Sequence, residues 1–439
     1  MFSFKTPNRY YLNGIDWSMA ALNALNIKKS GTGNHSQLIL VLKGYLEKDL
    51  ILKKITVSLS NGIFLRGRAK RAWHLAPYWC VEKKDFPPGD FSFYKIASTD
   101  TTELNTLIHD IAKAPFKDDK TLIQFYLIHF NNLSYLIMKF DHKMFDARGA
   151  EALLEHILGE KTQKEQYDLP VQGPQLNLWK SRFLSGRVIN RFLRSVYLTC
   201  KVATLKKKNN QNPFETDSYN FLYTTLSERK TDIIDKNTMD TAGYLMQGIY
   251  ILSIVTKAFD LLLKKHKKPG NILVSINVDV RETKFESSKI FFNNVSFMLF
   301  NLKQDRKISE YIIDLRKQFI LQVKKEIPRH FINASLLMRI LPVKVLALFM
   351  ELRMKKNPIT FSFSHISEQA FFLKNIKGHE VVNLFHIPLV PVSPGVGVFF
   401  TRFNNKLNMI ISSSDNRIDL KDAEFLEKTI VSGLIGGKI

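Results

Sequence analysis

Apolar and polar positions follow each other along the chain in short runs that predict both strands and helices. The runs at 120–130 and 133–140 are apolar and rich in β-forming residues, and Asn131–Asn132 between them predicts a hairpin turn. Further strands are predicted at 36–46, 271–282, 293–302, 358–366, 395–403 and 406–415. Helical spacing predicts helices at 17–27, 47–62, 149–157, 241–266, 308–326, 333–355 and 420–435.

Helices and strands are mixed in both halves of the chain, so the predicted fold class is α/β, or α+β in two layers. A chain of 439 residues is too long for one small core, and we expect two lobes, each with a mixed sheet and helices. The stretch from about 160 to 220 is polar and loop-rich at both ends. We therefore divide the chain into an N-terminal lobe (1–168), a basic crossover segment (169–214) and a C-terminal lobe (215–439).

The composition is that of a globular protein, with 45% hydrophobic residues. Two cysteines, Cys80 and Cys200, cannot build a disulfide framework or a zinc site, and a reducing cytoplasm is the expected setting. The most apolar stretch, 331–350, is interrupted by charged residues and a proline, so no membrane-spanning helix is predicted. That stretch is interpreted either as a core or tunnel-lining helix or as a membrane attachment.

The net charge of +24 predicts an anionic partner: nucleic acid, an anionic membrane surface, or an acidic or phosphorylated substrate carrier. Residues 169–214 contain no Asp or Glu, and an amphipathic helical pattern there carries Lys180, Arg187, Arg191 and Arg194. These cations are candidates for binding a membrane or an anionic donor. The alternative is a helix that packs on the core and shows its basic side to solvent. Nucleic acid ranks lowest, because the chain contains no recognised nucleic-acid-binding module.

One pair of chemically useful residues lies between the predicted strand 133–140 and the helix that follows. His142 and Asp146 occupy this short connection, and small residues lead from it into the helix. A side chain in such a strand-to-helix connection can face a cleft between layers. Taken alone, the pair also fits a buried histidine with a local hydrogen bond.

With this motif the sequence resembles the CoA-dependent acyltransferase superfamily, which includes chloramphenicol acetyltransferase, the condensation domains of peptide synthetases, wax ester synthases and alcohol acyltransferases. Their signature is His-His-x-x-x-Asp-Gly at such a junction. The stretches "LNGIDWSMAALN", "VSINVDVRE" with "FFNNVSFMLFNL", and "PGVGVFFTRF" resemble further family segments in the same order. The resemblance covers nearly the whole chain. It implies two chloramphenicol acetyltransferase-like lobes with an active-site tunnel at their interface.

The resemblance also implies a role for each motif residue. His142 would be the general base that removes a proton from the acceptor, which then attacks an acyl thioester directly. Asp146 would pair with Arg281 and hold the shape of the loop. Ser364 and Asn294 are candidates for stabilising the oxyanion. The alternatives are a strand hydroxyl bonded to backbone for Ser364 and a turn residue for Asn294.

The motif departs from the family pattern at two positions. Asp141 stands where relatives carry the first histidine, and Ala147 stands where they carry glycine. Asp141 places a carboxylate beside the base, which either tunes it or marks a member that has lost catalysis. His365 lies near the proposed site, but a lone histidine on a strand is more often structural. The remaining histidines have no metal-like spacing, and no metal site is predicted.

The resemblance therefore implies an acyltransferase that uses an acyl-CoA or acyl-carrier-protein thioester as co-substrate and has no permanently bound cofactor. The acceptor is a hydroxyl or amine on a small molecule or lipid, with a lipophilic acceptor favoured. The alternative is an inactive, condensation-like module that binds a carrier protein or a lipid. A cytoplasmic monomer is expected, with peripheral attachment to the inner face of the cytoplasmic membrane as an extension of that prediction.

Overall fold

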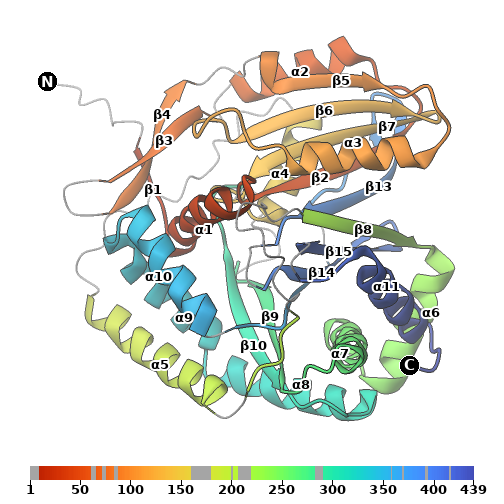
Figure 1. Ribbon diagram of the computed structural model, residues 1–439. Helices are drawn as coiled ribbons and strands as arrows, with labels where there is room; N and C mark the ends of the chain where they lie inside the picture. Colours follow the sequence, from red (N-terminus) through yellow and green to blue (C-terminus); the bar gives the residue numbers. More distant parts are fainter. Residues whose placement is uncertain are drawn as a thin grey trace, which may run out of the picture.

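Two six-stranded sheets and a three-stranded sheet organise the part of the chain that the computed structural model describes (Figure 1). The described residues are 9–60, 66–71, 76–83, 88–159, 179–198, 201–205, 219–281, 290–356, 358–367, 370–390, 394–414 and 417–439. Cys200 and both ends of the predicted crossover segment lie outside them. The small sheet consists of β1 (Arg9–Tyr11), β4 (Pro77–Lys83) and β3 (Arg66–Arg71).

The first large sheet is built around the predicted hairpin. Its strand order is β12 (Asn375–Ile376), β13 (His379–Pro388), β2 (His35–Lys43), β7 (Leu133–Asp141), β6 (Ile123–Phe130) and β5 (Phe91–Lys95). Asn131 and Asn132 join β6 to β7 with φ angles of 47° and 56°, which a tight hairpin turn requires. Strand β5 pairs with β6 in parallel, so the sheet is mixed as predicted.

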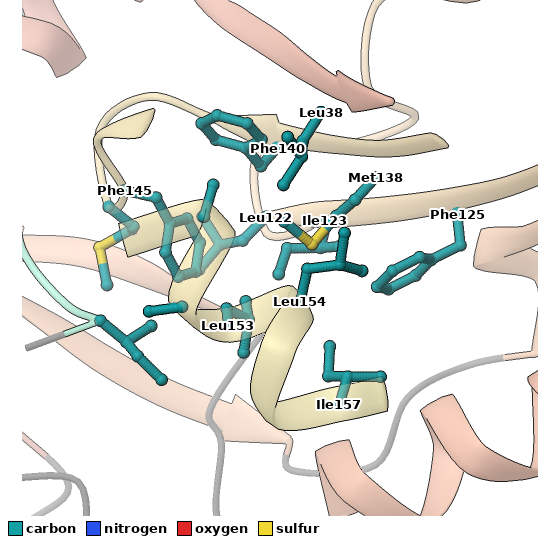
Figure 2. Close-up of a cluster of buried hydrophobic side chains, with 14 of the residues drawn as sticks. Leu38, Leu122, Ile123, Phe125, Met138, Phe140, Phe145, Leu153, Leu154 and Ile157 are labelled. Carbon is teal, nitrogen blue, oxygen red and sulfur yellow. The ribbon is translucent and has the colours of Figure 1, made fainter. Parts of the chain in front are cut away.

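Helices cover the first sheet, and one of them begins at the predicted motif. Helix α4 (Ala147–Leu158) packs Leu153, Leu154 and Ile157 against side chains such as Met138 and Phe125 of the sheet (Figure 2). The other helices of this half are α1 (Gly14–Ser30), α2 (Lys48–Ser60), the short 3₁₀ helix η1 (Pro88–Asp90) and α3 (Thr101–Lys113). The end of β7 therefore lies in a buried sheet and leads directly into a buried helix.

The second large sheet has the order β10 (Val295–Leu302), β9 (Ile272–Asp279), β11 (Phe361–Ile366), β14 (Val396–Phe403), β15 (Lys406–Ser414) and β8 (Tyr219–Leu226). Strand β11 runs parallel to both neighbours, so this sheet is also mixed. Helices α7 (Gln247–Lys265) and α11 (Leu420–Leu434) pack together and share a hydrophobic core with this sheet. Phe259 of α7 stacks on Phe361 with ring centroids 4.0 Å apart. This half also contains α6 (Glu228–Thr241) and α8 (Ile308–Lys324).

The late strand β13 ties the two halves together. It belongs to the C-terminal part of the sequence, yet it pairs along its length with β2 of the first sheet. A third core lies between the sheets, where Phe385 of β13 stacks on Tyr223 of β8 at 4.0 Å. The sequence predicted no strand at β13, so the predicted division of the chain at residue 215 places β13 in the C-terminal lobe.

Two predicted helices are shorter than expected. The helix predicted over 241–266 begins at Gln247, because Gly243 and Leu245 have positive φ angles and separate α6 from α7. The helix predicted over 333–355 is divided into α9 (Ile327–Ser335), the 3₁₀ helix η4 (Leu336–Ile340) and α10 (Val343–Lys356). Pro342 lies at the break between η4 and α10 and cannot continue a helical hydrogen-bond ladder. None of the helices in the described ranges is long and apolar enough to cross a membrane.

Candidate active site

The predicted motif forms the connection from β7 to α4. The backbone N–H of Asp141 donates to Leu122 O, and that of His142 donates to Asn34 O, at 2.9 and 3.1 Å. These bonds fix the last residue of the strand and the first residue of the turn. Asp146 then caps α4, because its Oδ1 accepts the backbone N–H of Gly149 at 2.8 Å.

Asp146 is buried, and besides capping α4 its carboxylate contacts two segments of the second half. Arg281, which follows β9, donates through Nη2 to Oδ1 and Oδ2 of Asp146 at 2.9 and 3.0 Å. The backbone N–H of Asn294, just before β10, donates to Oδ2 at 2.8 Å. The carboxylate therefore links the start of α4 to both strands at the edge of the second sheet. Asp146 and Arg281, which the sequence predicted to be partners, are in direct contact.

Arg281 lies between two carboxylates. Its Nη1 also donates to Oδ1 of Asp279 at 3.0 Å, and Arg148 of α4 donates to the other oxygen of Asp279 at 2.7 Å. Burial alone would lower the pKa of Arg281, but Asp146 and Asp279 outweigh it and raise the pKa. The guanidinium is therefore a charged connector between the two halves of the molecule.

His142 is partly exposed, and its orientation is set by Asn293, a residue not predicted from the sequence. Nδ1 of His142 lies 3.1 Å from Oδ1 of Asn293. The amide nitrogen of Asn293 donates to Oδ1 of Asp16 and to the carbonyl of His142, both at 2.9 Å. Because the nitrogen faces two acceptors, the oxygen must face the ring, and Nδ1 must carry the proton. In the neutral ring, Nε2 is then the bare nitrogen.

Asp16 holds Asn293 in place through hydrogen bonds. It is fully buried in α1 and accepts the backbone N–H of Asn293 at 2.9 Å, in addition to the amide. Its other oxygen accepts the backbone N–H of Asn13 at 2.7 Å, and the side chain of Asn13 caps the same helix. Burial raises the pKa of Asp16 to about 7, although the hydrogen bonds from Asn293 and Asn13 oppose the rise.

The sequence held a partial signal for Asp16 but none for its contact with Asn293. The pattern from Asn13 to Asp16 is a readable capping box at the start of a predicted helix. The contact itself spans 277 positions along the chain. The family resemblance pointed to Asn294, as an oxyanion donor, and not to Asn293, which contacts the histidine.

Asp141, which departs from the family pattern, directs its carboxylate to Lys143. Its Oδ2 forms an ion pair with Nζ of Lys143 at 2.8 Å, and its Oδ1 accepts the backbone N–H of the same residue at 2.9 Å. Lys143 also lies over the ring of Trp79, with its nitrogen 5.5 Å from the centroid. Both charged side chains are buried, so the carboxylate is neutralised by its neighbour in the turn.

The two predicted oxyanion donors lie on different elements. The side chain of Asn294 donates to the carbonyl of Phe292 at 2.9 Å. Ser364 lies in β11 of the second sheet, and in the described residues its hydroxyl has no hydrogen bond to His142. Its neighbour His365 has a buried Nε2, and burial, followed by the charge of Arg402, lowers the pKa of that ring to about 4. His365 is therefore neutral near pH 7.

The four predicted surface cations all lie on α5 (Trp179–Tyr197). Lys180, Arg187, Arg191 and Arg194 are exposed, and they recur at helical spacing on the outer face. The inner face of α5 packs against α9. The helix thus packs on the protein with one side and shows a basic side to solvent.

Comparisons with known proteins identify the fold. No protein-family model matches the sequence, and no curated protein matches it. Among solved structures, the first condensation domain of the CDA synthetase matches with a TM-score of 0.71 and 10% identity, over 97% of this chain and 95% of that one. The trichothecene 15-O-acetyltransferase of Fusarium sporotrichioides matches with a TM-score of 0.69 and 11% identity, over 97% and 94% of the two chains.

A third solved structure is a variant of the starter condensation domain of rhizomide synthetase, in complex with C8-CoA and Leu-SNAC. It matches with a TM-score of 0.68 and 11% identity, over 98% of this chain and 94% of that one. The protein therefore has the two-lobed fold of condensation domains and CoA-dependent acyltransferases. The resemblance read from the sequence is confirmed for the fold.

Proposed function

We propose that this protein is an acyltransferase that moves an acyl group from a CoA or acyl-carrier-protein thioester to a hydroxyl or amine. The observation that carries the proposal is the geometry of His142. Its Nδ1 is held by Asn293, and in the described part of the chain its Nε2 has no hydrogen-bond partner. A partly exposed histidine with a bare, unoccupied nitrogen is suited to remove a proton from a bound acceptor.

The proposed reaction has two steps. Nε2 of His142 takes the proton of the acceptor O–H or N–H while the acceptor oxygen or nitrogen attacks the thioester carbonyl carbon. The tetrahedral intermediate then collapses, the carbon–sulfur bond breaks, and the imidazolium returns its proton to the leaving thiolate. No acyl-enzyme is formed, and atoms and charge balance in both steps.

Asn293 has a defined part in this scheme. Its Oδ1 accepts the Nδ1–H of His142 in both the neutral and the charged ring, so the side chain holds the ring still while the proton moves. Asp16 lies one hydrogen bond further away, and in its ionised form the carboxylate favours the imidazolium that forms during the reaction. We propose Asn293 and Asp16 as positioning residues for the base.

The remaining site residues keep supporting roles in the proposal. Asp146 and Arg281 fix the turn that carries His142. Ser364 and the second amide N–H of Asn294 are the proposed donors to the oxyanion of the intermediate. The net charge of +24 favours CoA or an acidic carrier protein as the donor, because both are anionic.

The proposal is tested by mass spectrometry of products formed from a panel of acyl-CoA and acyl-carrier-protein thioesters with alcohol and amine acceptors. We expect a new ester or amide that depends on the wild-type protein. Thioester binding without any product across the panel would contradict the proposal and favour the inactive, condensation-like module, which binds a carrier protein or lipid without turnover.

A further inference from the structure

Helix α10 exposes an apolar stripe that no other described element covers. The stripe residues are separated by three, one and three positions, so they lie on one face of the helix. Their exposed fractions are 49, 56, 45 and 57% for Val345, Leu348, Phe349 and Leu352. The opposite face packs through Leu346 and Ala347, which are buried, and the helix lies against α1.

Cations surround this stripe. Lys344 lies at the start of α10, and Arg353, Lys355 and Lys356 lie at its end, all of them exposed. The only acidic residue of the helix, Glu351, is engaged by Lys29 at 3.1 Å and Lys355 at 3.0 Å. The guanidinium of Arg353 lies 5.4 Å from the ring centroid of Phe349, beside the stripe. An apolar centre with a positive rim is complementary to an anionic lipid surface.

A second basic surface lies close by. Helix α9, which leads through η4 to α10, packs along α5. Figure 1 draws α10, α9 and α5 along one side of the molecule. The exposed face of α5 adds Phe183 and Leu184 to its four cations. This side therefore combines two helices with exposed apolar and basic residues.

We propose that α10, with α5 beside it, docks this protein on an anionic lipid bilayer. Leu348, Phe349 and Leu352 enter the headgroup boundary, and the lysines and arginines contact lipid phosphates. A second copy of this chain is the poorer occupant, because two such faces would place cations against cations. The proposal concerns membrane association and does not depend on acyl transfer.

The test is flotation of the full-length protein with vesicles of phosphatidylcholine alone or mixed with phosphatidylglycerol. The variant Leu348→Ser/Leu352→Ser removes the centre of the stripe. Met239→Ser/Leu420→Ser is the matched control, because Met239 and Leu420 are exposed to 56 and 57% on α6 and α11, on the opposite side in Figure 1. Far-UV circular dichroism verifies that each variant is folded.

We expect binding to the anionic vesicles, weakened about tenfold or more by the α10 variant and unchanged in the control. Lys344→Gln/Lys356→Gln should weaken it about fivefold per charge at low salt, and added salt should weaken it further. Absence of vesicle binding, or equal binding to neutral and anionic vesicles, would overturn the proposal. An equal loss of binding in Leu348→Ser/Leu352→Ser and in the control Met239→Ser/Leu420→Ser would also overturn it. Binding of an acyl carrier protein alone, abolished by the α10 variant, would overturn it in favour of a protein partner.

Discussion

At the scale of single residues, the hydrogen bonds and burial of the imidazole ring distinguish the histidines of this fold. His35 is buried on β2, its Nε2 lies 2.6 Å from the carbonyl of Ala112, and burial lowers its pKa to about 3. Such a ring is neutral and structural. His142 has its Nδ1 on a side-chain amide, and its ring is partly exposed. This contrast, more than the motif alone, selects His142 as the proposed base.

Replacing Asn293 tests the proposed positioning of the base. Asn293→Ala removes the acceptor from Nδ1 of His142, so the ring can adopt either tautomer and several orientations. We expect kcat to fall roughly 10- to 1,000-fold with a much smaller change in KM. The variant also removes the side-chain amide that donates to the buried carboxylate of Asp16, which should cost about 1–3 kcal/mol of stability.

Steady-state kinetics and denaturant unfolding separate the two effects of Asn293→Ala. A loss of stability with unchanged kcat would mean that Asn293 is only structural and would contradict its positioning role.

Asp16 predicts a pH dependence of stability. Its pKa rises from 3.8 to about 7 on folding because the carboxylate is buried, so the folded protein binds the proton more tightly than the unfolded chain. The stability from this group is therefore complete below its unfolded pKa and is lost as the pH rises through about 7. Asp16→Asn should flatten the fall in unfolding free energy between about pH 4 and 7, although it lowers stability overall.

The measurement for Asp16 is urea unfolding of the wild type and Asp16→Asn across that pH range. Two curves that run parallel at every pH would show that Asp16 titrates alike in the folded and unfolded chain.

Residue identities at the site could be predicted only where a motif or a local pattern marked them. His142 and Asp146 lie four positions apart in one turn, and Arg281 was supplied by the family resemblance. Asn293 contacts His142 across 151 positions, and no local pattern distinguishes it from Asn294. The side chain that faces the ring depends on how the chain enters β10, which is a property of the tertiary structure.

At the scale of elements, the ion pair between Asp146 and Arg281 joins α4 to the edge of the second sheet. Both side chains are buried, with exposed fractions of 3 and 5%. Arg281→Met leaves the carboxylate of Asp146 buried without its cation, and we expect a loss of about 3–5 kcal/mol in unfolding free energy. Arg281→Lys should recover part of it, because lysine keeps the charge but not the two-pronged geometry.

Arg402→Met is the control for this prediction. Arg402 pairs with Asp235, and their side chains are exposed to 27 and 38%, so its removal should cost no more than about 1 kcal/mol. Equal losses in Arg281→Met and Arg402→Met, measured by denaturant unfolding, would show that burial does not strengthen the connection.

Elements were predicted well where the pattern was local. The hairpin of β6 and β7 follows from apolar runs and two asparagines, and α11 follows from helical spacing. Pro342 indicated a break, but the apolar residues on both sides of it favoured the prediction of one continuous helix. Strand β13 was missed, because its place beside β2 depends on pairing with residues more than 300 positions earlier.

At the scale of the whole molecule, β13 connects the two halves through both large sheets. The amide of Asn383 on β13 donates to Asn408 of β15 at 2.9 Å, so this strand bonds to both sheets. We expect one unfolding transition, with coincident curves from tryptophan fluorescence and far-UV circular dichroism. Trp17 and Trp79, which are buried in the first half, report on that half, whereas circular dichroism reports on the whole chain. Two separated transitions would show that the halves fold independently.

The central claim is that His142 removes the proton from the acceptor, and its most direct test is the rate of acyl transfer in His142→Ala. The control is His379→Ala, because His379 bonds only to the carbonyl of Lys43 in the described structure. With a thioester and acceptor that the wild type converts, we predict a fall of roughly 100- to 10,000-fold for His142→Ala and a near wild-type rate for the control. A near wild-type rate in His142→Ala, with product verified by mass spectrometry, would contradict the account.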